Sequence, residues 1–93
     1  MKILIVEDEI GIANFLQQGL EEEGYSILVA HDGKTGLELA LSQKVNVILL
    51  DWILPKMTGI EVCKAIRKKD TVTPIICLTA KDTVQETIEG LKA

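Results

Sequence analysis

The hydrophobic residues of this chain alternate between short continuous runs and longer stretches with helical spacing. Short runs with almost no polar positions are typical of strands that are buried on both faces of a sheet. This pattern predicts four strands: Lys2–Val6, Tyr25–Ala30, Val45–Leu50 and Ile75–Leu78.

The stretches after these runs carry apolar residues three and four positions apart, which predicts amphipathic helices. Capping and stop residues give their limits: Ile10–Glu23 followed by Gly24, a helix capped by Asp32 that ends near Ser42, a helix after Gly59, and a helix capped by Asp82 or Thr83. We expect these helices to face the sheet with Ile12, Phe15, Leu16, Gly19, Leu20 and Glu23, then Leu37, Ala40 and Leu41, then Val62, Cys63 and Ile66, and finally Val84, Ile88 and Leu91.

Strands that alternate with helices of this length indicate right-handed βαβ units and a parallel sheet. The length of 93 residues fits one domain, so residues 1–93 are interpreted as a single α/β unit. The sequence stops in the last predicted helix, where a further strand would ordinarily follow. We therefore expect a C-terminally incomplete domain whose fourth strand is an apolar edge, available for pairing in a dimer.

Composition and charge exclude several classes of protein. With 47% apolar and 26% charged residues the chain is globular, and its net charge of −4 argues against direct nucleic-acid contact by this segment. No apolar stretch is long enough to span a membrane, and Glu7 interrupts the only run that resembles a signal peptide. Cys63 and Cys77 have neither metal-ligand spacing nor disulfide density, so we expect two buried thiols in a reducing cytoplasm.

Three of the predicted strands end in oxygen-bearing side chains. Glu7 and Asp8 follow the first strand, Asp51 follows the third, and Thr79 follows the fourth. The carboxyl ends of parallel strands meet at one edge of a sheet, where ligands bind in open α/β folds. Taken singly, Glu7 and Asp8 also suit the start of a helix, and Thr79 suits a cap or a strand. Their joint placement favours a site.

The chemistry of this group indicates a divalent cation and a phosphoryl group. Mg²⁺ prefers oxygen ligands, so Asp8 and Asp51 are predicted to bind it directly and Glu7 to act mainly through water. A backbone carbonyl just after Asp51 would supply a further ligand. Carboxylates are covalent nucleophiles in phosphoryl transfer, so Asp51 is the candidate acceptor, with the Thr79 hydroxyl bonding to the transferred group.

These residues resemble a known family. The chain is similar over its whole length to the receiver domain of bacterial two-component response regulators, and most similar to the branch fused to winged-helix DNA-binding domains. The residues that carry the resemblance are Glu7-Asp8, Leu49-Leu50-Asp51-Trp52, Leu54-Pro55, Gly59 and Leu78-Thr79-Ala80.

The resemblance implies a flavodoxin-like α/β fold with strand order 2-1-3-4, here without the fifth strand and fifth helix. It implies a phosphorylation-switched signalling module, not an enzyme, in which a sensor histidine kinase phosphorylates Asp51 in a Mg²⁺-dependent reaction. The metal ligands would be Glu7, Asp8, Asp51 and the backbone carbonyl of Ile53, and Thr79 would be the switch hydroxyl. The resemblance also implies a cytoplasmic protein whose DNA-binding output domain is absent from this chain.

The chain departs from the family at one functional position. Family members carry a lysine at the end of the fifth strand that contacts the phosphoryl group, and no residue here matches it. Lys56 and Lys81 are predicted in loops near the site, but neither is assigned that role. The alternative interpretation is a truncated or engineered receiver fragment that is not phosphorylated and assembles through its fourth strand.

Two further functions have to be weighed. A metal-dependent phosphatase or phosphotransferase of the haloacid-dehalogenase type would need a second acid two residues after Asp51, where Ile53 stands. A flavodoxin-like binder of FMN would need a phosphate-binding loop rich in Gly, Ser or Thr after the first strand. The acidic Glu7-Asp8-Glu9 segment would repel that phosphate.

Overall fold

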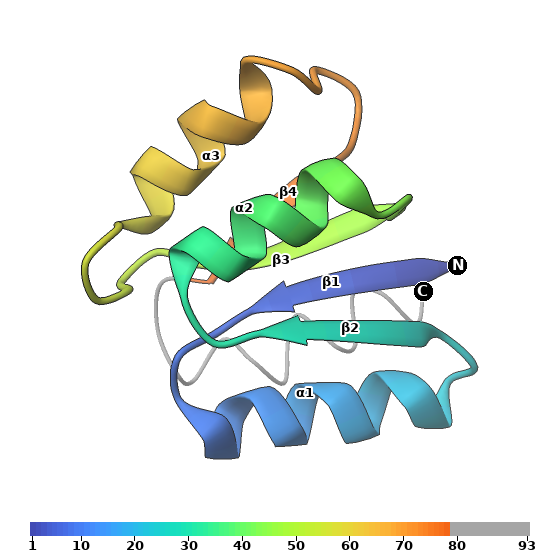
Figure 1. Ribbon diagram of the computed structural model, residues 1–93. Coiled ribbons are helices and arrows are strands. Elements are labelled where there is room, and N and C mark those ends of the chain that lie inside the picture. The colour runs from blue at the N-terminus through green and yellow to red at the C-terminus, as the bar shows by residue number, and fades with distance from the viewer. Residues whose placement is uncertain (79–93) are drawn as a thin grey trace.

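The computed structural model describes residues 1–78, which form a four-stranded parallel sheet flanked by three helices (Figure 1). The spatial order of the strands is β2-β1-β3-β4, as predicted. The elements along the chain are β1 (Lys2–Val6), α1 (Ile10–Glu22), β2 (Ser26–Ala30), α2 (Gly33–Ser42), β3 (Val47–Asp51), α3 (Gly59–Arg67) and β4 (Ile75–Leu78). The predicted fourth helix and Thr79 lie outside the described residues.

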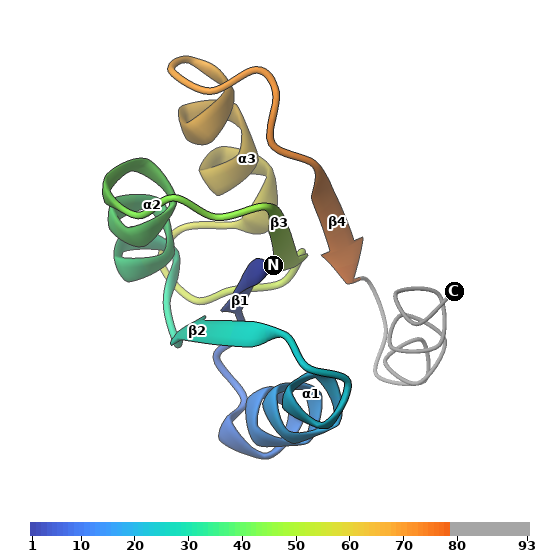
Figure 2. The same cartoon turned by 90° about the vertical axis from the view of Figure 1, so that its right-hand side faces the viewer.

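Side chains that alternate along the strands divide the core into two layers. On one face Leu4 and Val6 of β1 pack with Val62 and Ile66 of α3. On the other face the neighbouring residues of β1 pack with Leu16 and Leu20 of α1. The two views agree that α1 covers one face of the sheet and that α2 and α3 cover the other (Figures 1 and 2). Burial on both faces explains why β1 reads as an uninterrupted apolar run.

Local signals at the helix ends act as the sequence indicates. The Asp32 side chain caps α2 by accepting a hydrogen bond from the Thr35 N–H at 2.7 Å. Gly24 follows α1 with a φ of +92°, a left-handed conformation that side chains disfavour. These two residues fix where α1 stops and α2 starts, and so how the chain returns to the sheet.

Three residues predicted to face the core are exposed: Phe15, Glu23 and Leu41. Phe15 is 50% exposed because the buried stripe of α1 runs through Ala13, Leu16 and Leu20, roughly 130° away around the helix. Leu41 is 42% exposed because α2 lies on the sheet through small residues. A Cβ atom on Gly36 would come within 2.7 Å of a Val6 methyl group, so this close packing depends on glycine.

The prediction that both cysteines are buried is wrong for Cys77, which is exposed, while Cys63 is half-buried. Cys77 lies on β4, and within the described residues this strand pairs only with β3, so its other edge has no partner there. Several boundaries also differ from the prediction. The third strand begins at Val47 and ends at Asp51, the second strand begins at Ser26, and the first helix ends at Glu22. No helix within residues 1–78 has the length and apolarity needed to cross a membrane.

Candidate metal centre

The three predicted acids come together at the carboxyl edge of the sheet. β1 and β3 are neighbours, with Val6 in register with Leu50, so the residues that follow Val6 lie beside Asp51. One carboxylate oxygen from each of Glu7, Asp8 and Asp51 lies within 4.8 Å of the others. Residues far apart in sequence thus form one cluster of oxygen ligands, which is the arrangement that the strand ends predict.

Glu7 is the most buried member of this cluster, with 4% of its surface exposed. Its backbone N–H donates to the Ala30 carbonyl oxygen at 2.9 Å, and its carboxyl group accepts a hydrogen bond from the Glu9 N–H at 3.1 Å. Burial, together with the neighbouring Asp51 carboxyl group, raises the pKa of Glu7 to about 8, although the bond from Glu9 opposes this shift. Burial therefore favours the protonated form of Glu7.

Asp51 is held in place by its own backbone neighbours. The Ile53 N–H donates to Asp51 Oδ1 at 3.2 Å, and the Trp52 N–H donates to the Leu78 carbonyl oxygen at 3.0 Å. The second bond continues the pairing of β3 with β4 past Asp51. The carboxylate is half-buried, so it faces the cluster and remains within reach of solvent.

Gly59 packs closely against the backbone of Asp51 and Trp52 at the end of β3. The sequence alone did not indicate this contact. The Gly59 N–H donates to the Trp52 carbonyl oxygen at 3.1 Å, and a Cβ atom at this position would lie 2.5 Å from the Asp51 carbonyl oxygen. Only glycine allows α3 to begin this close to the end of β3. The sequence analysis placed Gly59 in a loop and in a family motif. The close approach of α3 to the end of β3 depends on tertiary structure and was not predicted.

Two further residues near the site were not assigned a role from sequence. The His31 Nδ1 atom lies 3.0 Å from the Glu7 carbonyl oxygen and joins β2 to the loop after β1. Lys56 has a φ of +67°, a left-handed conformation unusual for a residue with a side chain. Hydrogen bonds from Thr35 lower the pKa of Asp32, and the charge of Lys56 lowers it further, so the ammonium group acts near the start of α2.

The donor set fits a divalent cation. Three carboxyl groups at one strand edge supply hard oxygen ligands, and burial together with the neighbouring Asp51 carboxyl group raises the pKa of Glu7. The Ile53 backbone carbonyl stays a prediction as a ligand, since no described contact places it. Thr79 stays a prediction as the switch hydroxyl because it lies outside residues 1–78.

This parallel α/β sheet with an acidic cluster at the ends of β1 and β3 defines a receiver-like protein of the flavodoxin-like class. The model of the response regulator receiver domain matches residues 3–93, and the chain belongs to that family. Solved receiver domains share the fold. One is the receiver domain of the sensor histidine kinase PA1611 from Pseudomonas aeruginosa, described with a magnesium ion coordinated in its active-site cleft. It has a TM-score of 0.82 and 31% identity, over 95% of this chain and 73% of that chain.

Two curated relatives are transcriptional or response regulators. Response regulator ArlR of Staphylococcus saprophyticus is 49% identical over 90 residues, which are 97% of this chain and 40% of the relative. The alkaline phosphatase synthesis transcriptional regulatory protein PhoP of Bacillus subtilis is 45% identical over 91 residues, 98% of this chain and 38% of the relative. The chain thus spans about two fifths of the length of these relatives.

Proposed function

We propose that the chain is a phosphorylation-switched signalling module in which Asp51 accepts a phosphoryl group in a Mg²⁺-dependent reaction. The observation that carries this proposal is the cluster of Glu7, Asp8 and Asp51 oxygens within 4.8 Å of one another. Asp8 and Asp51 would hold the cation directly, with Glu7 and the Ile53 carbonyl completing the set. A bound Mg²⁺ would supply positive charge that offsets the charge of the incoming phosphoryl group.

The Asp51 side chain is suited to the role of acceptor. One of its oxygens is oriented by the Ile53 N–H, and the carboxylate is accessible enough for a donor to approach. In the proposed reaction an Asp51 oxygen attacks phosphorus, the bond from phosphorus to the donor breaks, and an aspartyl phosphate forms. Thr79 would then donate a hydrogen bond to a phosphoryl oxygen, which shifts the segment after β4 and changes the surface presented to a partner.

Membership of the family supports a proposal for the phosphoryl donor and for the domain that responds to phosphorylation. We propose a sensor histidine kinase as the phosphoryl donor and a DNA-binding output domain as the partner, both acting in the cytoplasm. The curated regulators are longer than this chain, which leaves room for such a domain in a full-length protein. The segment itself has a net charge of −4 and would not contact nucleic acid.

The test is an intact-mass measurement with acetyl phosphate as a small-molecule donor, with and without Mg²⁺. We expect a gain of one phosphoryl group that requires Mg²⁺ and disappears in Asp51→Asn. Asp70→Asn is the matched control, because it removes a half-buried acid of the loop before β4 and should leave the gain intact. Labelling that persists in Asp51→Asn, or that ignores Mg²⁺, would contradict the proposal.

The same experiment separates a switch from a phosphatase or phosphotransferase. Ile53 stands where a dehalogenase-type enzyme would place its second acid, and this side chain is 75% exposed and apolar. We propose that the module is not such an enzyme. It should therefore hold its phosphoryl group rather than turn over phosphate esters, and many turnovers of an added ester per molecule would show an enzyme instead.

One observation favours a second function, a receiver fragment that assembles through its edge strand. Ile76 and Cys77 of β4 are exposed, and in the described part of the chain β4 pairs with β3 alone. Such pairing would be apolar and insensitive to salt. This fragment would gain no phosphoryl group on Asp51, and Ile76→Lys would dissociate its dimer. A protein that is monomeric throughout would exclude this alternative.

A further inference from the structure

Two patches of opposite charge lie at the end of the sheet away from the acidic cluster. The strands are parallel, so α1, α2 and α3 all finish at the edge where the strands begin. The end of α1 carries the acidic corner, defined as Glu21, Glu22 and Glu23. The ends of α2 and α3 carry the basic corner, defined as Lys44, Arg67, Lys68 and Lys69. Because α1 lies on one face of the sheet and α2 and α3 on the other, the corners are separated by the sheet (Figure 2).

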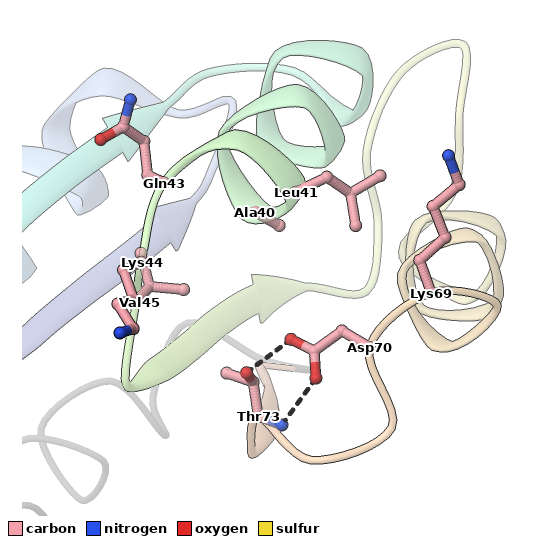
Figure 3. A pocket seen from close by; sticks show the side chains of 8 residues that line it. All are labelled: Ala40, Leu41, Gln43, Lys44, Val45, Lys69, Asp70 and Thr73. Atoms are coloured by element: carbon pink, nitrogen blue, oxygen red, sulfur yellow. Dashed lines mark hydrogen bonds between the residues drawn. The ribbon is translucent and has the colours of Figure 1, made fainter.

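The basic corner surrounds a cleft of about 360 Å³ between the end of α2 and the loop after α3 (Figure 3). Ala40, Leu41 and Val45 supply its apolar lining, while Lys44 and Lys69 lie on opposite sides of it (Figure 3). Leu41 is 42% exposed there, so the cleft offers an apolar floor between two lysine side chains. A glutamate side chain has matching chemistry, with a methylene stem and a charged end.

The acid nearest this cleft does not neutralise the lysines. The carboxylate of Asp70 accepts hydrogen bonds from the Val72 N–H at 2.9 Å, the Thr73 N–H at 3.1 Å and the Thr73 hydroxyl, so it is turned into its own loop (Figure 3). In residues 1–78 neither Lys44 nor Lys69 forms a salt bridge. Lys44 and Lys69 therefore have no ion-pair partner in this part of the chain, whereas the charge of Arg67 acts on the nearby Asp70 carboxylate.

We propose that this end face binds a second copy of the chain, with the acidic corner of each copy on the basic corner of the other. Two patches on one face pair reciprocally when a two-fold axis passes between them in the plane of the face, which gives a closed dimer rather than a filament. Glu21 and Glu22 are exposed and would enter the cleft beside Lys44 and Lys69. Charge complementarity between the corners identifies the occupant.

The expected association is weak and depends on salt. Exposed ion pairs contribute little each, so the dimer should be weak even though the two-fold axis repeats every pair. The paired charges would be in contact, so their attraction exceeds the repulsion between two net charges spread over each molecule. Salt screens these exposed pairs and should dissociate the dimer.

The first measurement is sedimentation equilibrium of the whole chain between roughly 0.05 and 1 mM, at about 20 mM and about 500 mM NaCl. We expect a dimer at low salt and at least a tenfold weaker association at high salt. A monomer at both salt concentrations, or association that strengthens with salt, would overturn the proposal. Association that ignores salt would indicate apolar pairing, as along the β4 edge, and would also overturn it.

Charge reversal tests the reciprocity of the contact. Lys44→Glu with Lys69→Glu brings the charge of the basic corner from +4 to 0, and Glu21→Lys with Glu22→Lys brings the charge of the acidic corner from −3 to +1. Each single substitution changes the formal charge by two and each variant carries two of them, so the wild-type value of −4 becomes −8 in the first variant and 0 in the second. All four side chains are exposed, and thermal unfolding should confirm that both variants stay folded.

Neither variant should self-associate, but an equimolar mixture should form a heterodimer at least as tightly as the wild type. The neutral variant separates this contact from net-charge effects, because loss of overall repulsion alone would make it associate more, not less. Net charge cannot explain a heterodimer either, because a neutral variant has no overall attraction to a variant with a charge of −8. A neutral variant that dimerises as well as the wild type, or a mixture that stays monomeric, would overturn the proposal.

Discussion

At the scale of single residues, the position of Asp51 depends on a glycine that makes no contact with a ligand. Gly59 lies so close to the end of β3 that a Cβ atom would be 2.5 Å from the Asp51 carbonyl oxygen and 2.7 Å from the Trp52 Cα atom. Both are backbone atoms of a packed strand end, which cannot move as a flexible side chain can. This residue therefore links local geometry to the site.

We expect Gly59→Ala to lower the free energy of unfolding by about 2–4 kcal/mol, because β3 or α3 must shift to accept the methyl group. Urea unfolding measures this change. Gly11→Ala is the matched control, since nothing lies within 4 Å of a Cβ atom at this position in α1. It should raise stability by about 0.5–1 kcal/mol through its helix propensity. Equal effects of the two substitutions would show that the close approach is not present in solution.

Glu7 is the second residue whose environment determines its behaviour. Its native pKa of about 8 lies above its ordinary value of 4.5, so the folded protein holds this proton more tightly than the unfolded chain. The contribution to stability is therefore full at pH below about 4.5 and is lost as the pH rises toward 8. Without a cation, the protein should become less stable across this interval.

We expect Glu7→Gln to remove that loss, because a neutral amide keeps an acceptor for the Glu9 N–H without a buried charge. In a chelator, the variant should exceed the wild type in free energy of unfolding by about 1–3 kcal/mol at pH 8, with a smaller difference at pH 5. Glu38→Gln, on the exposed side of α2, should show neither effect. A pH-independent difference for Glu7→Gln would contradict the raised pKa.

At the scale of elements, the loop that leads from α3 into β4 is organised around Asp70. Three hydrogen bonds, first from the Thr73 hydroxyl and then from the N–H groups of Val72 and Thr73, lower the pKa of Asp70 to about 2. The Arg67 guanidinium donates to the Asp70 carbonyl oxygen at 3.0 Å and joins the end of α3 to the same loop. This arrangement sets the register in which β4 enters the sheet.

A depressed carboxyl pKa contributes stability above the ordinary value of 3.8, and that stability is lost as the pH falls toward about 2. Asp70→Asn should therefore lower the urea midpoint at pH 7, and the difference from the wild type should shrink between pH 4 and pH 2. The group is half-buried in a surface loop where solvent screens its charge, so we expect a modest shift. A difference that stays constant down to pH 2 would mean that the charge of Asp70 is not responsible.

The positions of the strands followed from the sequence better than the faces of the helices. A strand such as β1 is apolar on both sides, so its run of Ile, Leu and Val is unambiguous. The faces of α1 and α2 are set by small residues, Ala13 and Gly36, which carry little hydrophobic signal. The large side chains of Phe15 and Leu41 led the prediction to place the buried face on a different side of each helix. Packing distance, rather than hydrophobicity, decides these faces.

At the scale of the whole molecule, the acid cluster was predictable because parallel strands bring their carboxyl ends to one edge. That rule needs only the strand order and the residues after Val6 and Leu50, both of which the sequence supplies. The support from Gly59 and the contact from His31 were not predictable, because each depends on which loops meet in three dimensions. The part of the switch assigned to Thr79 stays a prediction.

The cluster leads to a final expectation for the stability of the entire domain. The carboxyl groups of Glu7, Asp8 and Asp51 lie close together in the folded state and are separated in the unfolded chain, so a cation that binds them should stabilise only the folded form. At a Mg²⁺ concentration about 100 times its dissociation constant, the free energy of unfolding should rise by about 2.7 kcal/mol. Thermal unfolding should show this as an increase in Tm that a chelator reverses.

The control distinguishes a specific site from general screening of a chain with net charge −4. Asp8→Asn removes one proposed ligand and should lose most of the increase in Tm. Asp70→Asn changes the net charge equally, at a position where the loop and not the cluster uses the carboxylate, and should keep it. Sodium chloride at matched ionic strength should not reproduce the increase. An equal response of both variants to Mg²⁺ would mean that the three acids form no cation site, and the proposed phosphorylation mechanism would lose its basis.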